Sequence, residues 1–191
     1  MRFSQIVSLF LIVSFVSFTA CDSDSKSTVD ASEQKPVLSL TQHDSTILTQ
    51  AYVNSSWYEF GPRLRFLKNG TITGLGMMMP DSGSYEVTLW DLSDTSIVTT
   101  VTIAADSGEL KYVAIDPIQV QTDERYSVTI LSDDWYWFED ISGKNNFLPQ
   151  TFDDVMIEDY AYISGSTHQF PTDAFTDYLA GIQDIIFVPE K

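Results

Sequence analysis

The chain has 191 residues and a formal net charge of −17, with 27 acidic residues against 10 Lys and Arg. This balance makes nucleic acid and anionic membrane surfaces poor partners, because like charges repel. Cys21 is the only cysteine, so no disulfide can form within the chain.

The N-terminal segment predicts a lipoprotein signal peptide over residues 1–20. One basic residue, Arg2, precedes an apolar run without ionisable residues over positions 6–18. At ~13 residues this run is shorter than the roughly 20 that a membrane-spanning helix needs, so we expect cleavage. The Phe-Thr-Ala before Cys21 resembles the bacterial lipobox, with Phe where Leu is usual. We therefore expect Cys21 to carry a diacylglyceryl thioether and an N-acyl chain such as palmitate, which anchor the protein in a membrane.

Residues 21–50 are expected to form a flexible acidic tether. The stretch from 22 to 36 is polar, with no aromatic residue and no hydrophobic period, which is typical of a linker. An acidic residue directly after the cysteine is compatible with inner-membrane retention or with export to the outer face. We expect a lipid-anchored protein of the cell envelope, at the outer membrane or cell surface, because an aromatic-rich, acidic β domain is typical of surface lipoproteins.

From Trp57 onward, short runs of β-branched and aromatic residues are separated by Gly, Pro, Asn and Asp, a pattern typical of all-β domains. Residues 60–67 and 71–79 predict two strands, joined by a tight hairpin turn at Lys68-Asn69-Gly70. Further strands are expected at 85–91, 96–103, 110–115, 118–120 and 126–130. We therefore predict an antiparallel two-sheet β-sandwich, immunoglobulin-like or jelly-roll-like, over residues 51–191.

Several motifs of this region resemble the bacterial domain of unknown function 4082. The motifs are Gly70-Thr-Ile-Thr-Gly74, Leu89-Trp90-Asp91 and Tyr126-Ser-Val-Thr129, in the family's order, with a closing run over 179–189. The resemblance covers about residues 52–140 and implies an immunoglobulin-like β-sandwich of a kind often attached to secreted carbohydrate-active proteins. Gly76-Met-Met-Met79 departs from the family's Arg-Phe-Tyr-like run. Residues 140–175 fit the family poorly, so we expect a variable insertion near this segment.

Residues 135–138, Trp-Tyr-Trp-Phe, follow two aspartates and are the most unusual local feature. Strand alternation puts the two tryptophans on one face and the Tyr and Phe on the other. One pair could form a stacking platform for sugar rings, with the nearby carboxylates accepting hydroxyl hydrogen bonds. Alternatively, one pair belongs to the core and the other is half covered by the following loop. The candidate ligand-binding residues are Asp133, Asp134, Trp135, Tyr136 and Trp137.

Acidic pairs in the segment 153–159 raise the possibility of a calcium site, because calcium takes six to eight oxygen ligands. The candidate ligands are Asp153, Asp154, Glu158 and Asp159. The segment has no Asp-x-Asp-x-Asp-Gly loop, so a solvated acidic surface is the alternative reading. No other cofactor is expected.

The sequence carries no catalytic motif. His43 and His168 lack the spacing of a zinc site, and neither a Gly-x-Ser-x-Gly motif nor a phosphate-binding glycine loop is present. A glycoside hydrolase would need two convergent carboxylates in a pocket. We therefore expect no enzyme but a non-catalytic envelope binding module that recognises a polysaccharide or another envelope component. The alternative is a structural or protein-interaction lipoprotein with no small-molecule ligand.

Overall fold

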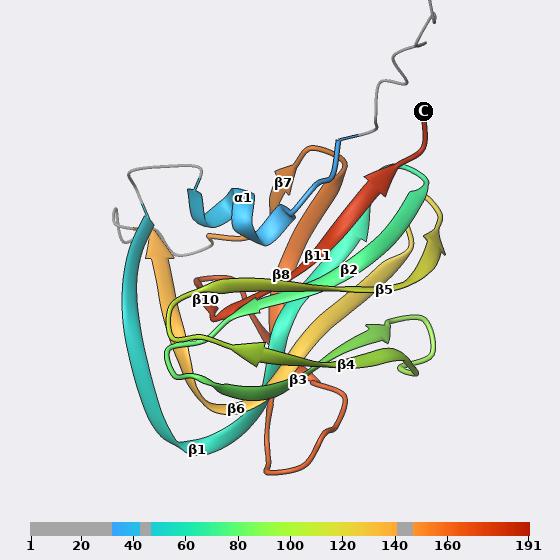
Figure 1. The fold of residues 1–191 in the computed structure, drawn as a ribbon. Helices are drawn as coiled ribbons and strands as arrows, with labels where there is room; N and C mark the ends of the chain where they lie inside the picture. The colour runs from blue at the N-terminus through green and yellow to red at the C-terminus, as the bar shows by residue number, and fades with distance from the viewer. Residues whose placement is uncertain (1–31, 43–46, 141–146) are drawn as a thin grey trace, which may run out of the picture. The chain divides into compact units, whose positions relative to one another are not determined.

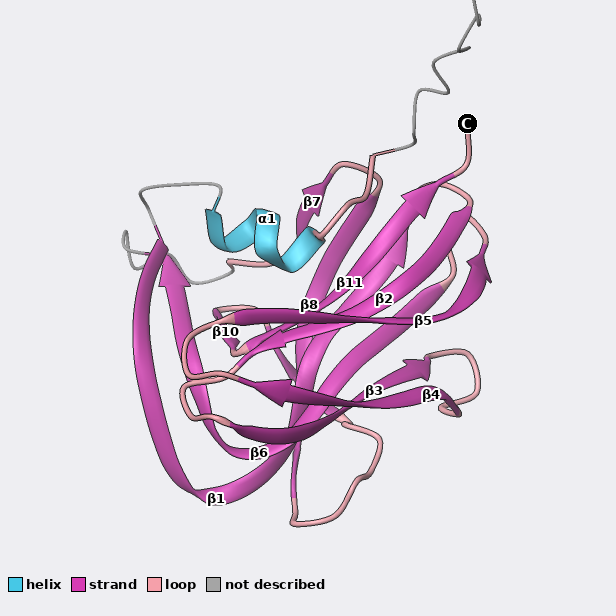
Figure 2. Ribbon diagram, in the orientation of Figure 1, coloured by secondary structure: helices cyan, strands magenta, loops and turns pink. Residues whose placement is uncertain are grey.

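The described part of the chain folds mostly into antiparallel strands, as Figure 2 shows. The computed structural model describes residues 32–42, 47–140 and 147–191. The elements in chain order are α1 (Pro36–Gln42), β1 (Ile47–Phe66), β2 (Gly70–Met78), β3 (Gly83–Asp91), β4 (Ile97–Ala105), β5 (Leu110–Val120), β6 (Arg125–Asp140), β7 (Gln150–Phe152), β8 (Val155–Ser164), β9 (Asp173–Phe175), β10 (Tyr178–Ala180) and β11 (Ile182–Pro189).

Two antiparallel sheets build the domain, which confirms the predicted all-β sandwich. The larger sheet has the order β4-β3-β6-β1-β8-β7, and β10 and β9 pair with β6 and β8 respectively. The smaller sheet has the order β11-β2-β5. Figure 1 shows the strands of the smaller sheet lying over those of the larger sheet.

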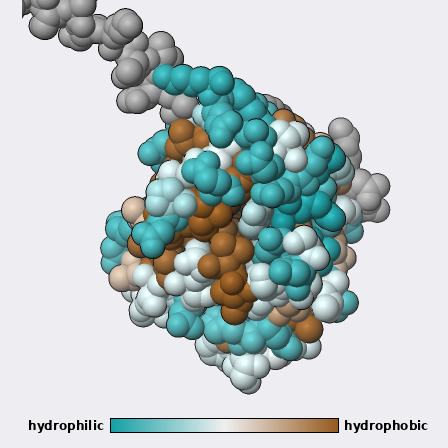
Figure 3. Space-filling view, turned by 90° about the vertical axis from the view of Figure 1, so that its right-hand side faces the viewer, coloured by the Kyte–Doolittle hydropathy of each residue, from teal (hydrophilic) through white to brown (hydrophobic). Residues whose placement is uncertain are grey.

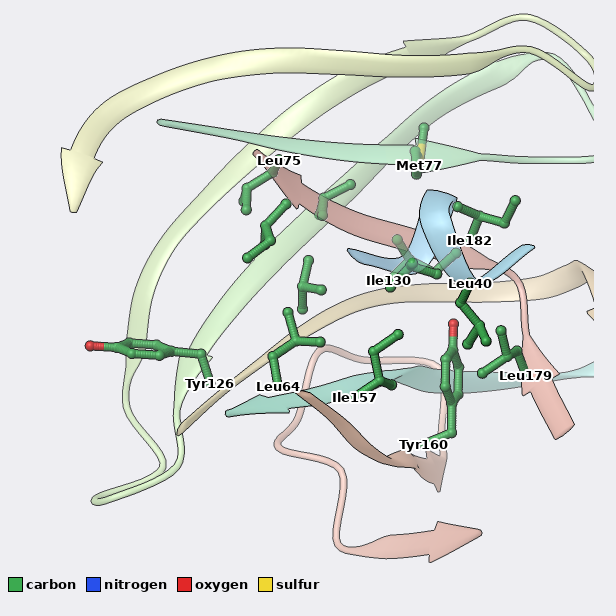
Figure 4. Close-up of a cluster of buried hydrophobic side chains, with 14 of the residues drawn as sticks. Leu40, Leu64, Leu75, Met77, Tyr126, Ile130, Ile157, Tyr160, Leu179 and Ile182 are labelled. Atoms are coloured by element: carbon green, nitrogen blue, oxygen red, sulfur yellow. The ribbon is translucent and has the colours of Figure 1, made fainter. Parts of the chain in front are cut away.

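The hydrophobic core lies between the two sheets. Figure 4 shows Leu64 and Ile157 of the larger sheet pointing toward Leu75 of the smaller one, and these three side chains are fully buried. They alternate with residues that face outward, because successive side chains of a strand point to opposite faces. Burial of each such side chain stabilises the fold by about 2 kcal/mol.

The N-terminal residues 34–42 pack on the sandwich, so the expected tether over 21–50 is wrong for this part. Gln34 forms a β-bridge with Phe187 of β11, and α1 follows directly. In addition, β1 begins at Ile47, so residues 47–50 belong to the larger sheet. The polar composition of the segment hid the buried residues of α1.

The helix α1 is fixed to β11 by both apolar contacts and hydrogen bonds. Val37 and Leu40 are buried, with 0% and 3% of their surface exposed. The Asp184 carboxylate of β11 accepts hydrogen bonds from the backbone N–H groups of Val37 (3.0 Å) and Leu38 (2.9 Å). These N–H groups lie in the first turn, where an α-helix has no internal acceptor for them. Residues 34–42 of the predicted tether are therefore held on the sandwich.

The expected hairpin at residues 68–70 is wrong, because β1 and β2 lie in different sheets. β1 pairs with β6 and β8, whereas β2 pairs with β5 and β11. The Asn69 side chain instead accepts hydrogen bonds from the backbone N–H (2.9 Å) and the hydroxyl (3.0 Å) of Thr122. Phe66 and Ile72, on either side of this corner, are both fully buried in the core. The chain therefore changes sheets here while it keeps both apolar faces inward.

The segment 140–175, predicted to be a variable insertion, supplies strands β7, β8 and β9 to the larger sheet. β8 pairs with β1 over residues 155–164, and its Val155 and Tyr160 are fully buried. A register shift in this pairing displaces Tyr160 from strict alternation with Val155. That irregularity masked the strand pattern.

The strands β9 and β10 lie on opposite sides of β1. β8 and β6 flank β1, β9 pairs with the far side of β8, and β10 pairs with the far side of β6. The chain from residue 173 to residue 180 therefore passes from one side of β1 to the other. The pairing of β1 with β6 also shifts between Val53 and Tyr58. The candidate site lies between β1, β6, β8, β9 and β10.

Candidate functional site

A pocket of about 290 Å³ lies between strands β1, β6, β8, β9 and β10. Seven of its eight lining residues are aromatic. We call it the aromatic pocket, and its lining residues are Tyr58, Phe60, Trp135, Trp137, Tyr162, Phe175, Tyr178 and Ala180. A concave site with such a lining can hold a flat or apolar group against aromatic faces.

The inner part of the aromatic pocket is rigidly packed. Phe60 and Trp135 are only 2% and 6% exposed, and their ring centroids are 5.0 Å apart. Tyr58 meets Trp135 edge to face, with the two centroids separated by 5.8 Å. Because these rings are fixed by the core, a ligand would not have to order them.

The outer part of the aromatic pocket is a row of half-buried rings. Tyr178 stacks on Trp137 with a centroid distance of 3.7 Å, and on Phe175 with a distance of 4.0 Å. Tyr162 continues the row, since its ring centroid lies 5.5 Å from that of Phe175. The row therefore joins side chains of β6, β8, β9 and β10 into one aromatic surface.

Strand register explains how these rings come to one face. Trp135, Trp137 and Glu139 alternate along β6, so they point to the same side. Tyr178 is the register partner of Glu139, and Ala180 that of Trp137. Directly opposed residues of an antiparallel pair share a face, so β10 adds Tyr178 next to the tryptophans.

The structure separates the predicted ligand-binding residues. Trp135 and Trp137 line the aromatic pocket, but Tyr136 lies on the other face of β6, where it packs toward Phe138 with centroids 6.5 Å apart. Asp133 and Asp134 do not line the pocket either. These three residues therefore lie outside the aromatic pocket, because alternation along the strand divides the segment between two faces, and their role in ligand binding stays a prediction.

Asp134 is a buried carboxyl away from the pocket. Only 7% of the residue is exposed, and burial, followed by the negative charge of Asp81, raises the pKa of its carboxyl. Asp133 adds a third negative charge nearby and raises that pKa further. These groups therefore do not offer hydrogen bonds to a ligand in the aromatic pocket.

Sequence reasoning missed six of the eight lining residues, Ala180 and five aromatic residues, which other strands bring next to the tryptophans. The missed aromatic residues are Tyr58, Phe60, Tyr162, Phe175 and Tyr178. The only local signal was the density of aromatic residues in the second half of the chain, with no indication of which strands pair. The pairing of β10 with β6 and of β9 with β8 decides their position.

The predicted calcium ligands are not gathered into a metal site. Glu158 pairs with Arg65 (3.3 Å) and Arg125 (2.6 Å), and Asp159 pairs with Arg63 (3.6 Å). Within the ranges that the structure describes, no group of three or more His, Cys, Asp and Glu residues could hold a metal ion. The carboxylates of Glu158 and Asp159 instead form ion pairs with arginines of β1 and β6.

The other two predicted ligands lie at the turn between β7 and β8. Asp153 is exposed and has a positive φ of 52°, while the Asp154 carboxylate accepts a hydrogen bond from the Gln34 amide at 2.8 Å. Asp154 therefore helps to hold the N-terminal segment and does not face Glu158 and Asp159 as a ligand set would require.

A second polar cluster connects the loop after β8 to the larger sheet. His168 Nδ1 lies 2.9 Å from Glu59 Oε2, and His168 Nε2 lies 2.9 Å from Glu86 Oε2. We call these three residues the His168 clasp. Glu59 is fully buried, and burial raises the pKa of its carboxyl, although hydrogen bonding by Thr129 and the charge of His168 counteract this effect. The carboxylates of Glu59 and Glu86 therefore converge on His168, and neither residue lines the aromatic pocket.

The hydroxyl of Thr129 completes this cluster below Glu59. It donates a hydrogen bond to Glu59 Oε1 and accepts one from Trp90 Nε1 at 2.8 Å. Trp90 therefore belongs to a chain of buried hydrogen bonds that links β3, β6 and β1.

Two residues considered in the sequence lie outside the described parts of the chain. Cys21, the predicted lipidation site, and His43 belong to segments that the structure does not describe. No described helix has the length and apolar character that a membrane span requires.

No family model matches the chain, and a search of curated proteins finds no match. The resemblance to the domain of unknown function 4082 therefore stays a prediction. The aromatic pocket has to be interpreted from its own chemistry.

Proposed function

We propose that the chain is a non-catalytic binding module that holds a sugar ring of a polysaccharide in the aromatic pocket. The observation that carries this proposal is the lining, in which seven of eight residues are aromatic. The axial C–H groups of a sugar ring pack well on aromatic faces, and a volume of about 290 Å³ suits a group of ring size.

Polar atoms at the pocket complement the apolar faces. The hydroxyls of Tyr58 and Tyr162 can each donate and accept a hydrogen bond, which sugar hydroxyls require. Trp137 Nε1 lies 3.3 Å from the Glu139 carboxylate, so a second polar group stands at the edge of the ring row. The stacked rings of Trp137, Phe175 and Tyr178 restrict one another, which reduces the entropy cost of binding.

We further propose that this module acts at the cell envelope, at the outer membrane or cell surface, through a lipid anchor on Cys21. Support comes from the predicted signal peptide and from the position of the single cysteine directly after it. The polar segment 21–31 would then separate the module from the membrane.

The alternative is a protein-interaction lipoprotein without a small ligand, and one feature favours it. β4 stands at the edge of the larger sheet and exposes Ile97 (54%) and Val98 (38%). Figure 3 shows that hydrophobic surface gathers in a band on one face of the molecule. Edge strands with exposed apolar residues can accept a strand from a partner.

A glycan and polysaccharide array probed with the purified full chain tests the proposal. A Trp137→Ala, Tyr178→Ala variant should weaken binding by at least roughly 30-fold, since the loss of even one central aromatic residue of a binding site costs about 2 kcal/mol or more. Trp57→Ala is the matched control, because Trp57 is 44% exposed and lies outside the pocket lining. Absence of binding to every glycan would reject the proposal and favour the β4 edge as an interaction surface.

A further inference from the structure

The aromatic pocket has acidic residues beside its rings. Glu139 follows Trp135 and Trp137 on the same face of β6, and its carboxylate accepts a hydrogen bond from Trp137 Nε1 at 3.3 Å. Glu139 is also the register partner of Tyr178. Its exposed side chain therefore stands directly next to the stacked part of the ring row.

A second carboxylate lies at the other end of the row. Asp173 of β9 is the register partner of Tyr162, and it shares a strand face with Phe175, two residues further on. Both Tyr162 and Phe175 line the pocket, and Asp173 is exposed. We call Glu139 and Asp173 the acidic rim.

No cation neutralises this rim among the residues that the structure describes. The arginines are engaged elsewhere: Arg63 with Asp159, and both Arg65 and Arg125 with Glu158. Lys111 pairs with Asp106 and Glu109 in the turn before β5, and Lys35 pairs with Glu33. No described Lys or Arg forms an ion pair with Glu139 or Asp173, so the rim adds to the field of a chain with a net charge of −17.

On this basis, and resting on the proposed function, we propose that the aromatic pocket selects an amino sugar, a hexosamine unit whose amine is free and protonated. The sugar ring packs on the aromatic faces, while its ammonium group lies near the carboxylate of Glu139 at one end of the ring row or near that of Asp173 at the other end. Aromatic faces themselves attract cations, and carboxylates near a low-dielectric surface attract them more strongly than carboxylates in bulk water. A uronic acid in the same position is repelled.

Glu139 and Asp173 are thus specificity-determining residues, and the aromatic rings supply affinity common to all sugars. A rim of this kind discriminates by charge and not by shape, so its effect depends on ionic strength. Salt at about 1 M shortens the screening length to about 3 Å and should reduce the preference.

The test is isothermal titration of the full chain with three oligosaccharides of equal length: a β-1,4-glucosamine oligomer, its N-acetylated counterpart and a uronic acid oligomer. The titrations are made at mildly acidic pH, where the amines of the free-amine oligomer are protonated. The free-amine oligomer should bind at least about 10-fold more tightly than the N-acetylated one, and the uronate should bind least.

A Glu139→Gln, Asp173→Asn variant should lose this preference, so that it binds the free-amine and N-acetylated oligomers with similar affinity. The matched control is Asp116→Asn, Glu190→Gln, which removes the same charge at two exposed positions outside the pocket lining. The control should keep the full preference, because these carboxylates do not adjoin the pocket.

The two proposals fail in different ways. Equal binding of the free-amine and N-acetylated oligomers, or an unchanged preference in the rim variant, would overturn the amino-sugar inference and leave sugar binding intact. If no oligosaccharide binds to the chain in a manner that depends on Trp137, the proposed function fails, and the inference fails with it.

Discussion

Asp184 illustrates how a single buried carboxyl determines the behaviour of a whole segment. It accepts hydrogen bonds from backbone N–H groups of α1 and from the hydroxyl of Tyr112 at 2.8 Å. Burial nevertheless raises the pKa of Asp184 to about 6 from its ordinary value of 3.8. The folded protein therefore keeps a proton that the unfolded chain releases between about pH 4 and pH 6.

The first prediction concerns the pH dependence of stability. Because the unfolded chain binds fewer protons in this window, the free energy of unfolding should fall as the pH rises from about 4 to about 6 and level off above. Asp184 alone should account for about 3 kcal/mol of this fall. Urea unfolding at several pH values should therefore show a shallower fall for Asp184→Asn than for the unchanged protein. The exposed Asp116→Asn variant should keep the original slope; an equal slope in Asp184→Asn would contradict this account.

The second prediction concerns Gly61, where β1 passes close to β6. A Cβ atom at this position would lie 1.9 Å from the carbonyl oxygen of Val128, which is backbone and cannot move aside. Gly61→Ala should therefore lower the free energy of unfolding by about 3 kcal/mol. The exposed Gly83 is the control, because its Cβ would meet only the Tyr85 ring, at 3.0 Å. A comparable loss in both alanine variants, measured by urea unfolding, would refute the close-approach explanation.

At the scale of elements, the His168 clasp connects the β8–β9 loop to β1 and β3. Each imidazole nitrogen of His168 lies 2.9 Å from a carboxylate oxygen, one of Glu59 and one of Glu86, and Glu59 is fully buried. Removal of the imidazole would leave the buried carboxyl group of Glu59 without its partner on the loop, which is costly.

The third prediction follows from this arrangement. His168→Ala should lower the free energy of unfolding by about 3 kcal/mol near pH 6. The same change in a Glu59→Gln background should cost clearly less, because a neutral amide needs no counter-charge. A double-mutant cycle from urea unfolding measures the coupling between the two residues. Additive effects of the two changes would show that the clasp contributes no interaction energy.

Strands with strict alternation were predictable, and the connections between them were not. The runs at 85–91 and 126–130 were expected from alternation alone, and they appear in β3 and β6. Asn69-Gly70 indicated a turn, but a turn signal does not say whether the chain stays in its sheet. β8 was missed because the register shift near Ile157 breaks its period.

The candidate site was predictable only where it depends on one strand. Alternation along β6 places Trp135 and Trp137 on one face without any knowledge of the fold. Tyr178 and Tyr162 reach the same pocket through pairings between segments distant in sequence, and these pairings are set by the whole sandwich. Local patterns therefore indicated the tryptophans but not the ring row that surrounds them.

At the scale of the whole molecule, the sandwich acts as a support that fixes an aromatic surface beside uncompensated acidic groups. The core between the sheets holds Phe60 and Trp135 in place, and the passage from β9 to β10 brings Phe175 and Tyr178 against them. We therefore expect a sugar ring to occupy the aromatic pocket.

The four tryptophans of the chain provide a direct measurement of this claim. Trp135 and Trp137 line the pocket, Trp90 is buried with its indole N–H bonded to Thr129, and Trp57 is exposed elsewhere. Titration of the ¹⁵N-labelled protein with a glycan selected on the array should shift the indole N–H signals of Trp135 and Trp137. The signals of Trp90 and Trp57 should stay in place and serve as internal controls. Binding of the glycan that shifts Trp57 alone, or leaves Trp135 and Trp137 unmoved, would contradict the claim.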